Sequence, residues 1–113
     1  MEELKSYAER SLAKGAKAVV LIGSLARGDY TAFSDADVLV LVEKSSKRPV
    51  DRIEDFIDPS LSLDLEPLVY AVDEFLEMAR EKRKVALEAV RYGKLLAGDS
   101  GILEKARKIL NSG

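Results

Sequence analysis

Apolar residues form two kinds of run along the chain, one continuous and one with helical spacing. The continuous runs are short and β-branched, at residues 18–22 and 38–42, and polar residues or glycine flank them. Such runs predict strands that are buried on both faces of a sheet. A third run at residues 61–70 alternates apolar and polar side chains, and Pro67 inside it indicates an edge strand or a bulge. Residues 94–97 predict a brief further strand.

Segments with helical spacing separate these strands. Helices are expected at residues 2–14, 24–30, 50–57, 73–79 and 82–92, and from Gly101 onward. The first is expected to present one apolar face made of Leu4, Tyr7, Ala8 and Leu12 and to stop at Gly15. In the third helix, Ile53, Phe56 and Ile57 are expected to face inward. Asp73 is the expected N-cap of the helix that follows the third strand.

The resulting order is α-β-α-β-α-β-α-α-β-α, which predicts an α/β fold with a mixed β-sheet flanked by helices. A chain of 113 residues is the size of one domain, so residues 1–113 are expected to form a single domain.

Composition narrows the function classes. The chain has 18 basic and 20 acidic side chains and a net charge of −2, which argues against docking on long nucleic acid. No apolar run approaches the roughly 18 residues that a spanning helix needs, and the N-terminus has no signal-peptide pattern. A cytoplasmic location is therefore expected, and with no cysteine neither a disulfide nor a thiolate metal site is expected.

Several residue types are missing. There is no His, Cys, Trp or Gln, and Asn111 is the only asparagine. Heat-adapted proteins typically have few thermolabile residues and many Lys, Arg and Glu residues. This composition therefore predicts a thermophilic source. Without histidine, a general base has to be a carboxylate, a lysine or a bound hydroxide, and a metal has to sit on oxygen ligands.

The turn after the first predicted strand has the chemistry of a phosphate site. Gly23 allows a tight turn and a close approach of a ligand to the backbone, and Ser24 would cap the next helix. The free amides and positive end of that helix favour an anion there. Arg27, one turn on, could face the same anion. The plainer interpretation, a strand-turn-helix with an ordinary cap, stays open.

Two aspartates precede the second buried strand. Asp35 and Asp37 lie at i and i+2, so in a strand they share a face, and two neighbouring carboxylates need a cation. Two Mg²⁺ ions, or Mn²⁺, roughly 4 Å apart would meet that need with oxygen ligands. Such a site often uses a third carboxylate from a neighbouring strand, for which Asp64 and Glu66 are candidates. The alternative is a turn of solvated acids.

The segment of residues 23–42 resembles the nucleotidyltransferase superfamily typified by DNA polymerase beta, and in particular its minimal stand-alone members. The resemblance rests on Gly23-Ser24, Arg27-Gly28 and Ser34-Asp35-x-Asp37 followed by apolar residues. It extends more loosely over residues 69–76 and 87–96.

The resemblance implies that Asp35, Asp37 and a third acid hold two Mg²⁺ ions and are catalytic. It also implies that Gly23, Ser24, Arg27 and Ser34 bind the nucleotide, with ATP as the expected substrate. The position of the third acid falls on Glu66 rather than Asp64, and glutamate departs from the commoner aspartate there.

Minimal members of this family are often paired with a helical HEPN-type protein in a toxin–antitoxin system. The resemblance therefore implies an antitoxin that transfers AMP from ATP to a hydroxyl of that partner. The alternative is a catalytically weak or inactive nucleotide-binding module that neutralises its partner by covering it. The apolar faces of the last helices belong either to the core or to a dimer or partner surface, so homo-oligomer formation stays open.

Overall fold

The structure is a computed structural model that describes residues 2–23, 36–43, 52, 56–57 and 65–112. Its elements are, in chain order, α1 (Glu2–Ala13), β1 (Ala16–Ile22), β2 (Ala36–Val42), β3 (Leu65–Ala71), α4 (Val72–Arg80), α5 (Lys84–Arg91), β4 (Lys94–Gly98) and α6 (Gly101–Ser112). These elements confirm the predicted α/β class with a mixed sheet flanked by helices. None of the described helices is both long and apolar enough to span a bilayer.

The four strands form one sheet in the order β3-β2-β1-β4. β1 runs antiparallel to both β2 and β4, whereas β2 and β3 are parallel. Pro67 lies in β3 at the edge of the sheet, as predicted, because an edge strand tolerates a residue that has no amide proton. The predicted strand at 94–97 is confirmed as β4, which adds to the free side of β1.

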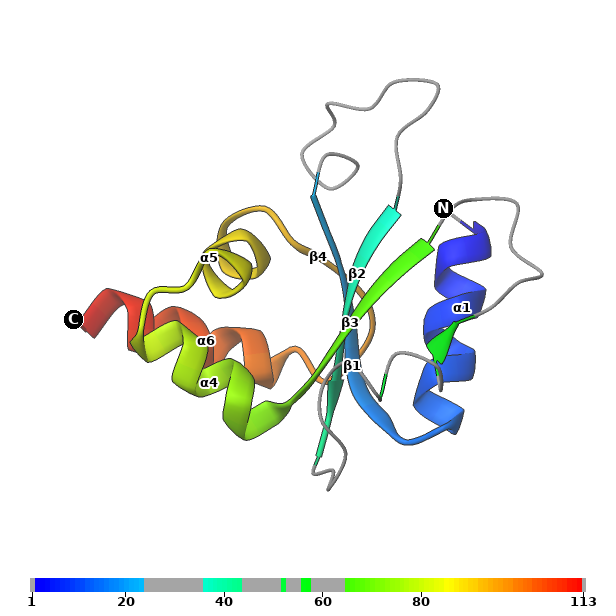
Figure 1. Ribbon diagram of the computed structural model, residues 1–113, viewed down its shortest axis with the longest axis horizontal. Helices are drawn as coiled ribbons and strands as arrows, with labels where there is room; N and C mark the ends of the chain where they lie inside the picture. The colour runs from blue at the N-terminus through cyan, green and yellow to red at the C-terminus, as the bar shows by residue number, and fades with distance from the viewer. Residues whose placement is uncertain (1, 24–35, 44–51, 53–55, 58–64, 113) are drawn as a thin grey trace.

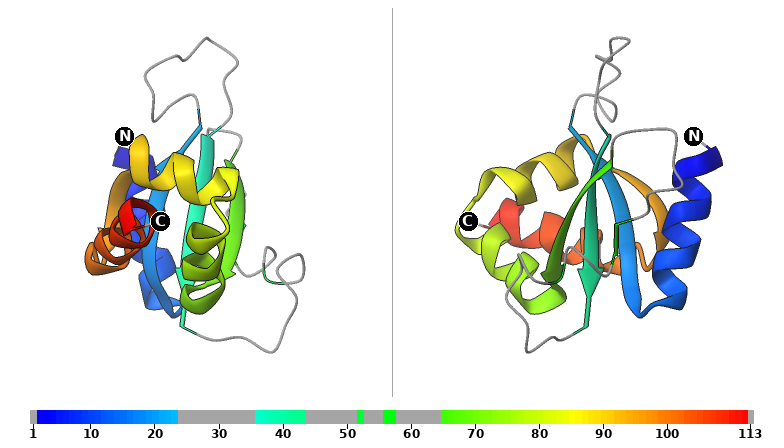
Figure 2. Two further views of the ribbon diagram at one scale, coloured as in Figure 1. Left: turned by 90° about the vertical axis from the view of Figure 1, so that its left-hand side faces the viewer. Right: turned by 45° about the vertical axis from the view of Figure 1, so that its right-hand side comes forward.

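Helices cover both faces of the sheet. Figure 1 shows α1 on one face and α4, α5 and α6 together on the other, and the second view in Figure 2 separates the two layers. Side chains of β1 alternate between these layers because successive residues of a strand point to opposite faces. Val19 and Leu21 pack on the α1 side, while Val20 and Ile22 pack on the three-helix side.

The core is thus divided into two clusters by the sheet. The α1-side cluster is made of Leu4, Tyr7, Ala8, Ala16, Val19, Leu21, Val38, Val40, Val42, Phe56, Val69, Ala71 and Leu96. The three-helix cluster is made of Ala18, Val20, Ile22, Leu39, Leu41, Phe75, Leu76, Ala79, Ala86, Ala89, Ile102 and Ala106. Ile102 and Ala106 of α6 therefore belong to the core. For these two residues, the apolar face of the last helix is part of the core rather than a partner surface.

Two local predictions are wrong. Asp73 does not cap α4, because the helix begins one residue earlier and its N-cap is Ala71. The carboxylate of Glu74 instead accepts the Ala71 amide proton, with 2.7 Å between N and Oε1. Ile57 is 48% exposed rather than inward. Phe56 fills the α1-side cluster and its carbonyl accepts the Tyr7 hydroxyl at 2.5 Å, so the next side chain points away. The predicted helix at 24–30 lies outside the described residues, and of the predicted helix at 50–57 only residues 52, 56 and 57 are described.

Candidate functional site

One end of the sheet gathers the ends of three strands. β1 finishes there with Ile22 and Gly23, and because β2 and β3 run the opposite way, both begin there (Figure 1). Ile22 pairs with Asp37 in β2, and Asp37 pairs with Glu66 in β3. A residue from the first predicted strand and two acidic positions from separate motifs therefore stand in one row across the sheet.

The pleat decides which face this row belongs to. Asp37 precedes Leu39 and Leu41 by two and four residues, so it shares their face, which is the three-helix side. Leu68 and Tyr70 of β3 pack against the same cluster, so register position 66 belongs to that face as well. Neighbouring strands lie about 4.8 Å apart. The two acidic positions are therefore next to one another at the strand ends.

Gly23 fits this row for a steric reason. Its φ is +80°, in the region that favours glycine, and an added Cβ would lie 2.6 Å from Oδ2 of Asp37 and 3.3 Å from its Cγ. A side chain at position 23 would therefore both strain the backbone and push the carboxylate aside. In the structure the group that approaches the Gly23 backbone is the half-buried Asp37 side chain, and the approach of a ligand there stays a prediction.

Of the other predicted site residues, the structure describes only the backbone of Glu66. Ser24, Arg27, Ser34, Asp35 and Asp64 lie outside the described residues, and Glu66 is described by its backbone within β3. In the described part of the chain no group of three or more His, Cys, Asp or Glu side chains is arranged to hold a metal ion. What the structure provides toward a metal is Asp37 with position 66 in register. A carboxylate such as that of Asp37 supplies the oxygen ligands that suit Mg²⁺ or Mn²⁺.

Lys94 is a further charged residue at this end of the sheet. It opens β4 and pairs with Leu21, one step before Ile22. Because Leu21 belongs to the α1-side cluster, the pairing places Lys94 on the face opposite Asp37. No local sequence pattern points to a role for Lys94, because the antiparallel pairing of β4 with β1 joins segments that are far apart in the chain.

The opposite end of the sheet holds a different carboxylate. Glu74, in the first turn of α4, accepts hydrogen bonds from the guanidinium of Arg52 with N–O distances of 2.5 and 3.5 Å. The Arg52 side chain is 6% exposed and the Glu74 side chain 40%. The hydrogen bond from Arg52 lowers the pKa of Glu74, and the Ala71 amide adds to that effect against the opposing effect of burial. This pair links Arg52, which lies between β2 and β3 in the chain, to the first turn of α4.

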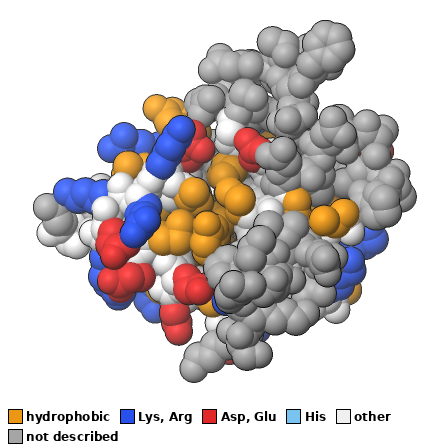
Figure 3. All heavy atoms as spheres, in the orientation of Figure 1, with side chains coloured by type: hydrophobic (Ala, Val, Ile, Leu, Met, Phe, Trp, Pro, Cys, Tyr) orange, Lys and Arg blue, Asp and Glu red, His pale blue; other side chains and the backbone are white. Residues whose placement is uncertain are grey.

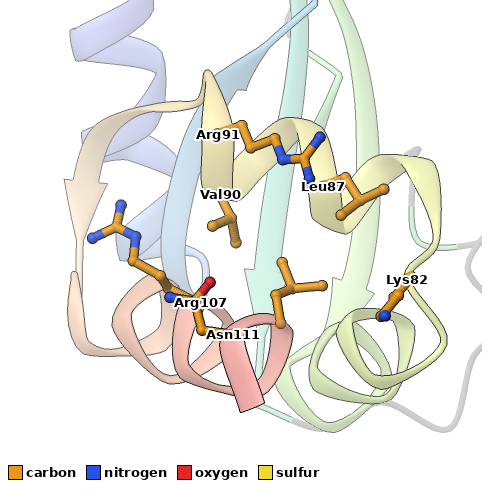
Figure 4. A pocket seen from close by; sticks show the side chains of 7 residues that line it. Lys82, Leu87, Val90, Arg91, Arg107 and Asn111 are labelled. Atoms are coloured by element: carbon orange, nitrogen blue, oxygen red, sulfur yellow. The ribbon is translucent and has the colours of Figure 1, made fainter. Parts of the chain in front are cut away.

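Two hollows lie within the helical layer of the described residues rather than at the strand ends. One, of about 480 Å³, lies between α5 and α6 and includes Arg91 and Arg107 (Figure 4). The other, of about 420 Å³, lies beside β3 and α4 and includes Tyr70 and Met78. Neither contains Gly23, Asp37 or Glu66 among its lining residues.

Comparison with known proteins gives both a family match and structural matches. Residues 2–96 match the family model described as a nucleotidyltransferase domain. No curated protein matches the chain. The match covers Gly23, Asp37 and Glu66, so the row at the sheet end lies inside the matched segment.

Solved structures of similar fold include a toxin–antitoxin with AMP-PNP, at 19% identity and a TM-score of 0.65, covering 96% of this chain and 85% of that one. One mutant of the toxin–antitoxin MntA-HpeT matches at 15% identity and a TM-score of 0.63, covering 96% and 85% of the two chains. A second mutant of the same toxin–antitoxin matches at 19% identity and a TM-score of 0.61, covering 99% of this chain and 85% of that one. At these identities the likeness is one of fold.

Proposed function

Because this chain belongs to the nucleotidyltransferase domain family, we propose that it transfers AMP from ATP to a hydroxyl of a partner protein. We propose further that the partner is a helical HEPN-type toxin and that this chain is its antitoxin. The observation that supports this most strongly is the row of Ile22, Asp37 and position 66 beside Gly23. Structural neighbours described as toxin–antitoxin proteins, one of them with AMP-PNP, support the choice of partner and nucleotide.

In this proposal Asp35, Asp37 and Glu66 hold two divalent cations. Bound Mg²⁺ or Mn²⁺ supplies positive charge for the triphosphate and for the departing pyrophosphate. Gly23, Ser24, Arg27 and Ser34 hold the phosphates. Gly23 contributes its lack of a side chain, which leaves room for the Asp37 carboxylate against the backbone. The register of Glu66 with Asp37 favours Glu66 over Asp64 as the third acid.

A transfer assay tests the proposal. The full chain is incubated with α-³²P-labelled ATP, Mg²⁺ and a small helical HEPN-type protein as the candidate partner. The expected result is label on the partner with equimolar pyrophosphate release, both abolished by EDTA. An unlabelled partner in a stable, folded complex would argue against AMP transfer.

The second candidate is a binding module that neutralises its partner without chemistry. Glutamate at position 66, one methylene longer than aspartate, is the observation that favours it. The two candidates separate in Asp35→Ala: an enzyme loses both labelling and neutralisation, whereas a binding module neutralises the partner as before. Binding of the partner by Asp35→Ala in a pull-down shows that the variant is folded in either case.

A further inference from the structure

The hollow between α5 and α6 has three cations around an apolar floor. Lys82 reaches it from the turn between α4 and α5, Arg91 from the end of α5 and Arg107 from α6 (Figure 4). Leu87, Val90 and Leu110 provide the aliphatic surface between them. A volume of about 480 Å³ lies within the range of sites that accept several side chains or a small ligand. We call this hollow the α5–α6 groove.

The charges of the α5–α6 groove have one sign. No carboxylate belongs to its lining in the described chain. Neither Lys82 nor Arg91 has an ion-pair partner among the described residues. Arg107 contacts Glu104 at 3.1 Å, but at least half of each side chain is exposed, and such pairs exchange readily because solvent screens them.

Lys82 occupies an unfavourable backbone conformation. Its φ is +57°, and it is the only non-glycine residue with positive φ in the described segments. It occupies the residue after the C-cap of α4, where its amide bonds Ala79 at 3.1 Å and the next amide, of Arg83, bonds Met78 at 2.9 Å. This is the helix end at which glycine is usual. A lysine there bears strain, and strain of this kind gathers at binding sites.

The positive charge is local. The second hollow, on the same layer, is lined by Glu74, Glu77 and Glu81 against a single Arg83. Figure 3 shows several blue side chains at the upper left, over the helical layer, and several red ones at the lower left, with blue and red in contact between them. The chain as a whole has a net charge of −2, so the groove is an exception to the overall charge. Its lining has no aromatic side chain on which a base would stack, which weighs against nucleic acid.

We propose that the α5–α6 groove docks an acidic, amphipathic helix of the partner protein. Apolar side chains of that helix would cover Leu87, Val90 and Leu110, and its carboxylates would meet Lys82, Arg91 and Arg107. This inference rests on the proposed function, because the docked protein is the one that receives the nucleotide. The groove and the sheet end are joined by α5. At its end, a Cβ on Gly93 would lie 2.7 Å from Cγ1 of Val20, so the helix is fitted closely to β1.

The test uses two synthetic helical peptides of equal length with leucines at i, i+3, i+4 and i+7. One carries glutamates beside that stripe and the other carries lysines. Fluorescence anisotropy with the full chain is expected to give at least tenfold tighter binding of the acidic peptide, weakening as salt rises. Amide shifts in NMR should concentrate at Leu87, Val90 and Leu110. Equal affinity of the two peptides, or shifts elsewhere, would overturn the docking proposal.

Charge reversal gives the matched variants. Arg91→Glu should lower the affinity for the acidic peptide about three- to tenfold and raise the affinity for the basic peptide. Lys5→Glu, on the exposed side of α1, should change neither affinity. Lys82→Gly should raise the melting temperature by about 4 °C while lowering affinity for the acidic peptide. Unchanged affinity in both groove variants would contradict the proposal.

Failure of docking and failure of catalysis are distinguishable. Asp37→Asn should leave peptide binding unchanged, and Arg91→Glu should leave Mn²⁺-dependent binding of a non-hydrolysable ATP analogue unchanged. Loss of peptide selectivity with intact nucleotide binding would reject the groove alone. The reverse pattern would reject the nucleotide site alone.

Discussion

The two ends of the sheet treat acidic residues in opposite ways. At the end where β3 runs into α4, Glu74 is held by the buried Arg52 guanidinium and by the Ala71 amide. At the other end, the Asp37 side chain lies close to the backbone of Gly23, and Asp37 pairs in register with position 66 of β3. The ion pair of Glu74 with the buried Arg52 stabilises the fold. In the proposed function, Asp37 and Glu66 would instead share a bound cation, because neighbouring carboxylates repel one another unless positive charge lies between them.

The largest expected effect is at Asp37. Asp37→Asn should lower nucleotidyl transfer by about 10²–10³-fold, because a neutral amide loses the several kcal/mol of charge stabilisation that a metal supplies. Thermal unfolding of the variant should stay close to that of the parent. The matched control is Asp73→Asn, an exposed acid in the first turn of α4, which should keep full transfer activity. Equal losses in both variants would remove the distinction between the two ends.

Gly23→Ala should have the second-largest effect on nucleotidyl transfer. The added methyl group would meet Oδ2 of Asp37 at 2.6 Å at a φ of +80°, so both stability and transfer should fall, transfer by about tenfold or more. Gly15→Ala is the control, because Gly15 also has positive φ, +110°, yet has nothing within 4 Å of the added Cβ. It should lose about 1–2 kcal/mol of stability and no transfer activity per folded molecule. Circular dichroism melts and initial rates measure the two quantities separately.

Arg52→Met should affect only stability. It removes a buried guanidinium and its hydrogen bonds to Glu74, which should lower the free energy of unfolding by about 1–3 kcal/mol. The loss stays in that range because Glu74 is 40% exposed and water can replace its partner. Urea titration measures the change. A drop in transfer rate at full folding would mean that the two ends are coupled.

The smallest effect concerns pH. The hydrogen bond from Arg52 depresses the pKa of Glu74 in the folded protein, so the folded state binds the proton less readily than the unfolded chain. The stabilisation is complete above the unfolded pKa of about 4.3 and is lost as pH falls through the lower folded value. Solvent screening should limit it to less than about 1 kcal/mol. Glu74→Gln should therefore make the free energy of unfolding depend less on pH in this range. Urea unfolding at a series of pH values from about 3 to about 6 measures the change.

Local pattern was enough to predict most elements. The buried strands β1 and β2 are evident because both faces are covered, so every residue of the run is apolar. Pro67 correctly indicated an edge strand. The helix face of Leu4, Tyr7 and Ala8 is confirmed by their burial. These features depend on neighbours in sequence, which is why they are readable from it.

Features that depend on distant segments were not predictable. Arg52 and Glu74 are 22 residues apart, and their pairing follows from the crossover rather than from a motif. The same carboxylate takes the role expected of Asp73, since it can reach the Ala71 amide and Arg52 together. The pairing of Asp37 with Glu66 follows from how β3 joins β2, so the sequence pattern left Asp64 and Glu66 open and only the family resemblance favoured Glu66. The sequence supplied the acids, and only the sheet puts them in one row.

The most direct test of the sheet-end site is Mn²⁺ binding, because it needs no acceptor. Electron paramagnetic resonance would follow free Mn²⁺ as it is titrated into the full chain with a non-hydrolysable ATP analogue. We predict nucleotide-dependent binding of Mn²⁺ that is lost in Asp37→Asn and weakened in Glu66→Gln, and retained in Asp73→Asn. Mn²⁺ binding that is the same in all four proteins would contradict the assignment of this sheet end as the nucleotidyl-transfer site.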